Sequence, residues 1–303
     1  MVIKARSYDK EKDFEYIMKF LGDLYEETKS YENWFPDRFE NSSHDREDGI
    51  RIWEEFDEQL SEKFKKPVAL TTRESPQSYF LNIHPNYRHL EKEMIEWIQK
   101  NFKERIENND KSKRKVYINI LEGNQQREET LSNLGFKNEG IYGYYRIRKA
   151  GLPIPNYPCP EGFTIRAIRD RDLDQQALLI QRVFGHGEWF TADVLRWIRS
   201  CSFAREELDL VAVTEDGTIA SFCTYRVDPN SNITSLEPMG TNPDYRGLGL
   251  GKAIMVEGLK RAMKYNPPFF YIDGAANTPA ANRLYDVTGF HEKITIFSWT
   301  KHV

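Results

Sequence analysis

Cysteine is scarce in this chain, and long apolar runs are missing from it. The three cysteines, Cys159, Cys201 and Cys223, are an odd number without metal-ligand spacing, which argues against a disulfide framework and a zinc site. No stretch approaches the ~18 consecutive apolar residues of a transmembrane helix, and residues 1–4 do not begin a signal peptide. The sequence therefore predicts a soluble, cytoplasmic protein of a reducing compartment.

A strong charge of either sign is also absent. Lysine and arginine number 43 and aspartate and glutamate 47, giving a net charge of −4. A nucleic-acid-binding protein needs a basic face, which this balance does not favour. The histidines show no ligand spacing, so we expect no metal. We expect neither nucleic acid nor a membrane as a partner, and a monomer or a homodimer.

The 303 residues, 39% of them apolar, are enough for two ordinary domains. In the first half, periodicity and turn residues predict alternating strands and helices. The predicted strands are 1–6, 67–72, 78–83 and 116–121, with a closing hairpin over 136–148. The predicted helices are 9–25, 50–64, 90–106 and 125–134.

Prolines are dense at one point of the chain, Pro153, Pro155, Pro158 and Pro160. Proline at that density forms neither a helix nor a central strand, and it stiffens a connector. We therefore predict a first domain over 1–148, a linker over 149–162 and a second domain over 163–303.

The second half repeats the order of the first. Its predicted strands are 163–168, 208–214, 218–227, 232–240, 269–273 and 290–301, and its predicted helices are 172–184, 191–200, 250–265 and 279–287. Short phrases also recur: His-Pro-Asn-Tyr-Arg at 84–88 corresponds to Asn-Pro-Asp-Tyr-Arg at 242–246, and Leu-Gly-Phe at 134–136 to Thr-Gly-Phe at 288–290. These repeats indicate a tandem duplication.

The stretch 236–252 predicts a strand, a turn, a glycine-rich loop and the start of a helix. Gly247, Gly249 and Gly251 lack a Cβ, so a ligand can approach the main chain. Free N–H groups at a helix N-terminus favour an anion such as a pyrophosphate. The loop lacks both the Gly-Lys-Ser/Thr ending of a P-loop and the spacing of a dinucleotide fold. A glycine-rich turn without a ligand is the alternative.

Arg246-x-x-Gly249-x-Gly251, behind Pro243-Asp244-Tyr245, resembles the acyl-CoA pyrophosphate loop of the GNAT superfamily of N-acyltransferases. Asn277 through Tyr285, followed by Gly289-Phe290, resembles the superfamily's other signature. The resemblance covers about residues 160 to 303 well and 1 to 148 loosely. It implies an α/β fold of two tandem GNAT-like domains, each a mixed, mostly antiparallel sheet flanked by helices, in a layout similar to that of mycothiol synthase-like enzymes.

The resemblance also implies acetyl-CoA as cosubstrate and a small-molecule primary amine as acceptor. The residues it places at acetyl-CoA are Met239, Gly240, Thr241, Arg246, Gly247, Leu248, Gly249, Leu250, Gly251, Lys252, Asn277, Asn282 and Tyr285. Tyr285 would also protonate the departing CoA thiolate; a core tyrosine with a satisfied hydroxyl is the alternative. His186 falls where the family borders its acceptor, although a mobile surface histidine explains it as well.

An alkylamine is protonated near neutral pH, so a general base must take its proton. Glu237, on the strand before the loop, is the first candidate, and Asp273, at the end of the next buried strand, is the second. Each has an alternative, a strand-end acid paired with an arginine such as Arg246. We expect the strand to separate from its neighbour at Gly240, exposing main-chain groups of Met239 and Thr241 to the pantetheine and the thioester carbonyl.

The first half differs at the positions that matter for an anion. Arg88, Glu91 and Glu93 stand where Arg246, Gly249 and Gly251 stand in the second half. A carboxylate there repels a phosphate by about 4 kcal/mol at an effective dielectric near 20. We therefore predict that the first half does not bind CoA in the usual way and serves as a scaffold; the alternative is that its aromatic loop helps to shape the acceptor pocket. The alternatives to an N-acetyltransferase are a non-catalytic acyl-CoA sensor and an aminoacyl transferase acting on tRNA-borne amino acids.

Overall fold

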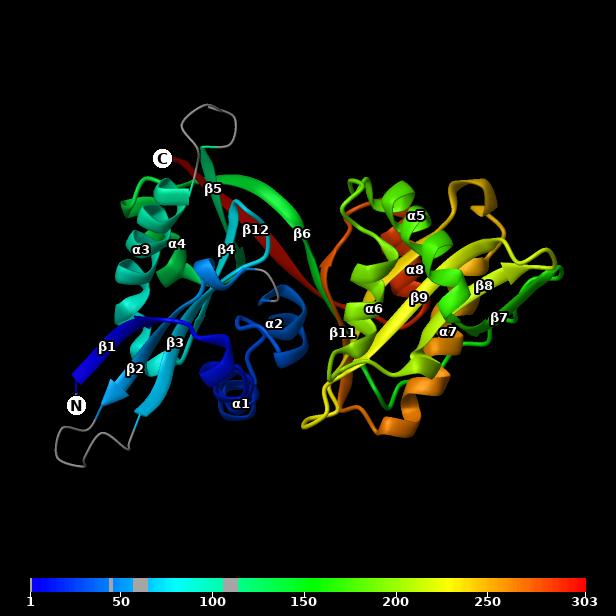
Figure 1. The fold of residues 1–303 in the computed structure, drawn as a ribbon, viewed down its shortest axis with the longest axis horizontal. Coiled ribbons are helices and arrows are strands. Elements are labelled where there is room, and N and C mark those ends of the chain that lie inside the picture. The colour runs from blue at the N-terminus through cyan, green and yellow to red at the C-terminus, as the bar shows by residue number, and fades with distance from the viewer. Residues whose placement is uncertain (1, 44–45, 57–64, 106–113) are drawn as a thin grey trace. The chain divides into compact units, whose positions relative to one another are not determined.

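A computed structural model describes residues 2–43, 46–56, 65–105 and 114–303. The chain forms two compact units, which are taken in turn below (Figure 1). The first consists of Met1–Tyr142 and Thr295–Val303, and the second of Gly143–Ile294. Strand β6 (Lys137–Lys149) leaves the first unit at Tyr142, and strand β12 (Glu292–His302) returns to it at Thr295.

The first unit contains a mixed sheet in the order β1-β2-β3-β4-β5-β12. Only the β4–β5 pair of this order is parallel, and the other four are antiparallel. The strands are β1 (Val2–Ser7), β2 (Arg51–Phe56), β3 (Lys65–Arg73), β4 (Ser78–Ile83) and β5 (Lys115–Leu121). The helices are α1 (Lys10–Thr28), α2 (Pro36–Ser43), α3 (Glu91–Arg105) and α4 (Gln125–Asn133).

Alternation along β4 sends its side chains to two cores on opposite faces of this sheet. Tyr79 and Leu81 pack with the apolar face of α3, whereas Phe80 packs against the cluster that contains α1. The helix predicted over 50–64 is wrong for Arg51–Phe56, which is β2; residues 57–64 lie outside the described residues. β2 pairs with strands on both sides, and this pairing overrides the apparent helical spacing.

The two repeats exchange their last strands: the last strand of the second repeat, β12, pairs in the first unit, and the last strand of the first repeat, β6, pairs in the second. β12, which ends the chain, pairs with β5, where Trp299 stands opposite Ile118. β6, which follows α4, pairs instead with β11 (Phe269–Ala275). The hairpin predicted over 136–148 is therefore wrong, because these residues form one long strand.

The second unit has the strand order β6-β11-β10-β9-β8-β7. The remaining strands are β7 (Phe163–Ala167), β8 (Asp209–Thr214), β9 (Ile219–Val227) and β10 (Thr234–Thr241). The helices are α5 (Leu173–Phe184), α6 (Ala192–Ser200), α7 (Leu250–Ala262) and α8 (Pro279–Val287). As in the first unit, a single pair of neighbours in this order, β10–β11, is parallel.

Helices cover both faces of this part of the sheet. Leu210 and Ala212 of β8 pack in a cluster with α7, while Val211 and Val213 pack in another with α5 and α6. The predicted α/β fold with mixed, mostly antiparallel sheets flanked by helices is confirmed. The predicted linker, 149–162, lies within the second unit, so the compact units divide at 142 and 294 and not at the prolines. No helix in the described ranges is long and apolar enough to cross a membrane.

The pairing of β12 generates a prediction about stability. Trp299 is 6% exposed in the first unit's core, so we expect Trp299→Ala to lower the free energy of unfolding by ~3–5 kcal/mol. The matched control is Trp189→Ala, because Trp189 is 61% exposed and should cost less than ~1 kcal/mol. Urea denaturation measures both. Equal losses in the two variants contradict the placement of β12.

Candidate functional site

The glycine-rich loop ends where α7 begins, and its backbone is left-handed at two glycines. Gly247 has a φ of +84° and Gly249, the N-cap of α7, a φ of +87°. A Cβ at either position meets nothing within 4 Å, so the space beside the main chain is open. Within the described residues, the N–H groups of Gly249, Leu250 and Gly251 donate to no protein acceptor. Together with the helix dipole they form a cradle for an anion.

The turn before this loop is held by side chains. Asn242 Oδ1 accepts from the main-chain N–H of Asp244 at 3.2 Å and from Arg182 of α5 at 3.0 Å. Arg182 also binds both carboxylate oxygens of Asp244 at 2.9 Å, and this bonding lowers the pKa of Asp244. Arg246 Nε donates to the carbonyl of Thr241 at 3.3 Å, which ties the loop to the end of β10.

Strand β10 separates from β11 soon after it begins. The parallel pairing covers Thr234 with Phe270 and Ser235 with Tyr271 and then stops. On its other edge β10 stays paired with β9 as far as Thr241, after a register shift between Leu236 and Met239. The edge of β10 toward β11 is therefore open from Leu236 onward, where an extended ligand with amide groups can pair with the main chain.

The expectation that the strands separate at Gly240 is wrong, because they separate earlier. Gly240 has a packing role instead: a Cβ there would lie 2.5 Å from Phe222 Cζ and 2.8 Å from Val183 Cγ1. Only glycine lets β10 lie this close to α5. At Gly251, by contrast, a Cβ would lie 3.5 Å from Met239 Cε and from Thr241 Oγ1, which is ordinary van der Waals contact.

Helix α8 is held by an arginine that the sequence reading missed. Arg146 of β6 is 2% exposed and donates to Asp286 Oδ1 at 2.7 Å, to the carbonyl of Phe290 at 3.0 Å and to Asn282 Oδ1 at 2.5 Å. Asn282 also donates to Asn277 Oδ1 at 3.2 Å. The predicted contact of Asn277 or Asn282 with CoA stays a prediction. The side-chain oxygen of Asn282 already accepts a hydrogen bond from Arg146.

Tyr285 packs against the same core cluster as Met239, beside Arg146, whose Cζ lies 5.8 Å from the ring centroid. Burial raises the pKa of Tyr285, and Arg146 opposes part of that rise. Among the described residues its hydroxyl has no hydrogen-bond partner. The phenol is therefore protonated at neutral pH and its proton is available to an incoming group.

The two candidate bases differ in their surroundings. Glu237 Oε2 lies 3.4 Å from Arg226 Nη1, so the arginine beside it is Arg226 and not Arg246. The Glu237 side chain is 39% exposed and that of Arg226 only 3%. Asp273 is partly buried near the end of β11, where the pairing with β6 shifts register between Ile272 and Ala275.

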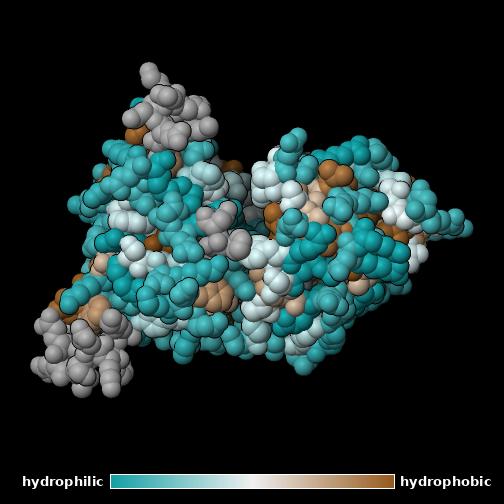
Figure 2. Space-filling model, in the orientation of Figure 1, coloured by the Kyte–Doolittle hydropathy of each residue, from teal (hydrophilic) through white to brown (hydrophobic). Residues whose placement is uncertain are grey.

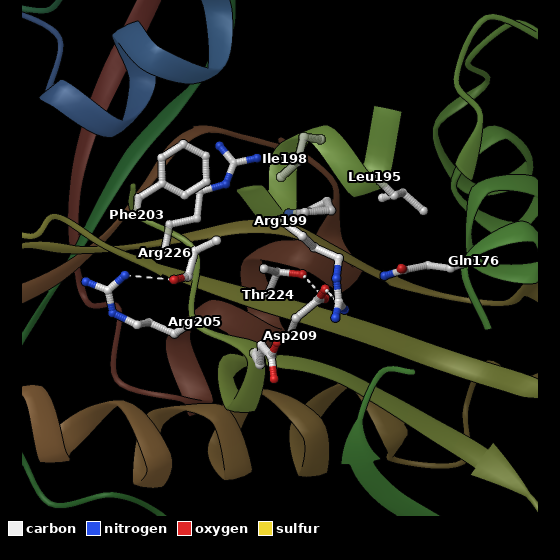
Figure 3. A pocket seen from close by; sticks show the side chains of 12 residues that line it. Gln176, Leu195, Ile198, Arg199, Phe203, Arg205, Asp209, Thr224 and Arg226 are labelled. Carbon is white, nitrogen blue, oxygen red and sulfur yellow. Dashed lines mark hydrogen bonds and ion pairs between the residues drawn. The ribbon is translucent and has the colours of Figure 1, made fainter. Parts of the chain in front are cut away.

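A cavity of about 80 Å³ lies beside β9 and β10 on the face covered by α5 and α6 (Figure 3). Pro238 of β10 and Arg226 of β9 line it, together with Phe203 and Asp209. Burial raises the pKa of Asp209, while Thr224, at 2.8 Å, and Arg199, at 3.2 Å, stabilise its charged form. This cavity gives the site a space separate from the open edge of β10.

His186 lies in the segment between α5 and α6 among aromatic rings. Its ring centroid is 5.6 Å from that of Phe184 and 5.4 Å from those of Trp189 and Phe190. Burial lowers its pKa, so the imidazole is neutral at pH 7. Phe184 and Trp189 are exposed. The face of this unit that Figure 2 shows has hydrophobic areas among hydrophilic ones.

The corresponding position of the first unit is filled by protein charges. Glu91, at the start of α3, is 1% exposed and lies 2.9 Å from Arg127 Nη2. Arg88 binds Asn124 at 2.8 Å and forms an ion pair with Glu32. Glu93 accepts from the Trp53 indole at 2.8 Å. Here a carboxylate of the chain occupies the start of the helix, where the second unit has open glycine backbone.

Residues 175–290 match the family model described as the acetyltransferase (GNAT) family. This segment of the chain belongs to the GNAT family. Structural likeness extends over both repeats: a tandem GNAT protein from the clavulanic acid biosynthesis pathway matches with a TM-score of 0.68 at 11% identity, covering 99% of this chain and 98% of that one. A GCN5-related N-acetyltransferase from Sphaerobacter thermophilus matches with a TM-score of 0.68 at 17% identity, covering 99% and 95%.

Curated relatives of this chain are named mycothiol acetyltransferase. The protein from Salinispora arenicola is 31% identical over 187 residues, covering 56% of each chain. The one from Thermobispora bispora is 30% identical over 174 residues, covering 52% of this chain and 56% of its own. The chain therefore spans about half the length of the curated relatives it matches.

The geometry of the GNAT loop predicts a selective loss of ligand affinity. Gly249→Ala should lower the free energy of unfolding by ~1–2 kcal/mol, because an L-residue is strained at positive φ. Its methyl group also occupies the open side of the cradle, so we expect the affinity for acetyl-CoA in calorimetry to fall on the order of tenfold or more.

Gly217→Ala is the matched control for this variant. Gly217 also has a φ of +87° with nothing within 4 Å of a Cβ, but it lies in the turn between β8 and β9. We expect the same loss of stability and unchanged acetyl-CoA affinity. Equal affinity losses in both variants would mean that the cradle does not bind the diphosphate.

Proposed function

We propose that the protein is an N-acetyltransferase that moves an acetyl group from acetyl-CoA to a primary amine of a small molecule by direct attack. The observation that carries this proposal is the open cradle at the start of α7 beside the free edge of β10, in the part of the chain that matches the family. The names of the curated relatives, which are acetyltransferases of a small molecule, support it.

Acetyl-CoA would be bound by main-chain groups more than by side chains. The diphosphate would accept hydrogen bonds from the N–H groups of Gly249, Leu250 and Gly251, with Arg246 and Lys252 as nearby positive charges. The pantetheine amides would pair with β10 from Leu236 to Thr241. A main-chain N–H near Met239 would polarise the thioester carbonyl and stabilise its developing charge.

Glu237 is our first candidate for the general base, and Tyr285 for the general acid. The acceptor ammonium gives a proton to the Glu237 carboxylate, and the freed amine nitrogen forms a bond to the acetyl carbon. The carbon–sulfur bond breaks, and the thiolate takes the phenol proton of Tyr285. The acylated nitrogen releases its second proton to water, which returns a proton to the Tyr285 phenolate. Arg226 Nη1 lies 3.4 Å from the Glu237 carboxylate. Asp273 remains the second candidate base.

A non-catalytic acyl-CoA sensor is the second reading of the same cradle. A sensor would bind acetyl-CoA in the same way. It would need neither a proton acceptor at Glu237 nor a proton donor at Tyr285, and both side chains are present. Transfer to any amine above the uncatalysed rate separates the two readings. In either reading the first unit is a scaffold, since Glu91 fills its cradle.

Substitution of the candidate bases tests the proposal. Glu237→Gln keeps the shape of the side chain and removes the base, so we expect kcat to fall on the order of a hundredfold or more. Asp273→Asn is the control and should change kcat less than threefold. The rate at which the CoA thiol is released gives kcat for both variants. A reversed order of effects would assign the base to Asp273, and a small loss in both variants would remove the base from these strands.

Tyr285→Phe tests the proton donor. Because burial raises the pKa of Tyr285, the phenol stays protonated up to about pH 10. We expect kcat to fall roughly 10²-fold in the variant at every pH between about 6 and 9, with the affinity for acetyl-CoA unchanged in calorimetry. Loss of affinity with unchanged kcat would instead mean that Tyr285 is a core residue that supports binding.

A further inference from the structure

Arg226 is a buried guanidinium with few partners. Its side chain is 3% exposed, and Figure 3 shows it beside the Phe203 ring, with Cζ 4.9 Å from the centroid. Within the described residues its one ion pair is with Glu237, at 3.4 Å, and its Nε has no hydrogen-bond partner. A buried N–H without an acceptor is costly, and a guanidinium offers five donors in a planar fork.

The rest of the cavity leaves this charge uncompensated. The buried carboxylate of the cavity, Asp209, already has Thr224 and Arg199 as partners, and the other lining carboxylate, Glu206, is exposed. Arg205, which also lines the cavity, donates to the carbonyls of Ser202 and Ala204. Among the described residues that line the cavity, Arg226 is therefore the arginine whose Nε is buried without an acceptor, and Leu195, Ile198 and Phe203 contribute apolar side chains to the same lining.

We propose that the acceptor is a small amino acid, an amine with a carboxylate close to it, and that Arg226 binds this carboxylate. The inference rests on the proposed acetyltransferase function. Arg226 and Glu237 present opposite charges 3.4 Å apart, which complements a molecule that carries an ammonium and a carboxylate side by side. The planar fork of arginine suits a carboxylate.

Binding of the amino acid through its carboxylate also places its ammonium group for proton transfer to Glu237. The substrate carboxylate takes the donors of Arg226, while its ammonium lies against Glu237, the proposed base. The ammonium proton then passes to Glu237, and the neutral amine attacks the thioester carbon. A phosphate dianion fits less well, because Glu237 would repel it at this distance. A cavity of about 80 Å³ restricts the group beyond the carboxylate to a few atoms.

A panel of matched amines tests the acceptor class. Glycine, L-alanine and L-serine are compared with glycinamide, L-alaninamide and L-serinamide, which keep the amine and lose the carboxylate charge. CoA release gives kcat/KM for each. We expect the free acids to exceed their amides by roughly 10- to 100-fold, the usual effect of a hydrogen bond to a charged group.

Variants of two lining arginines show which residue causes the preference for free acids over amides. Arg226→Gln should bring acids and amides within about threefold of each other, and Arg226→Lys should restore part of the preference. Arg205→Gln, in the same cavity, should leave it intact. Acetyl-CoA affinity, measured by calorimetry in every variant, shows that the fold and the cradle remain. Retention of the preference in Arg226→Gln, or its loss in Arg205→Gln, overturns the assignment.

Failure of this inference differs from failure of the proposed function. If amides or simple alkylamines such as ethylamine are acetylated as well as the free acids, the amino-acid class is wrong and the acetyltransferase stands. Absence of transfer to all three free acids, with acetyl-CoA bound, also overturns the amino-acid class. If acetyl-CoA does not bind, the proposed function itself is wrong.

Discussion

The candidate site depends on main-chain N–H groups at the start of α7 that have no protein acceptor among the described residues. Helix N-termini expose such groups in general, and most are capped by a side chain. Here the N-cap is Gly249, which has no side chain to cap them and which adopts a positive φ that other residues rarely adopt. The cradle is therefore both open and chemically unsatisfied, which are the two conditions for binding an anion.

The comparison between the two units shows how the same element can lose this property. The first unit also leads from a short turn into a helix, α3, but Glu91 brings its own carboxylate to the position and Arg127 neutralises it in a buried ion pair. Removing one partner of such a pair is strongly destabilising, so the network favours a structural role. The duplication has thus produced one helix start that can take a ligand and one that is satisfied internally.

The sequence predicted the backbone of this segment well because its features are local. Glycine at 247 and 249, and the turn before them, depend on a few adjacent residues, and the structure has the strand, turn, loop and helix in that order. The helix predicted over Arg51–Phe56 was wrong because that segment is fixed by strands on both sides of it. Local spacing cannot report pairing with residues that are distant in the chain.

The arginines that hold the site were missed because they contact it from strands that are distant in the sequence. Arg146 holds α8 from a strand that follows the first repeat in sequence, and the alternation of Arg146 and Arg148 in an apolar strand was the available signal. Arg226, beside Glu237, was missed because antiparallel β9 and β10 bring the two together across a register shift that the sequence does not mark. The residues around the cavity likewise come from α5, α6, β8, β9 and β10.

A crystal structure of the protein with acetyl-CoA tests the central claim most directly. The account predicts one acetyl-CoA in each chain, with its diphosphate on the N–H groups of Gly249, Leu250 and Gly251 and its pantetheine along β10 after Ser235. A diphosphate bound at the start of α3 beside Glu91, or a second unit without acetyl-CoA at saturating concentration, would contradict it.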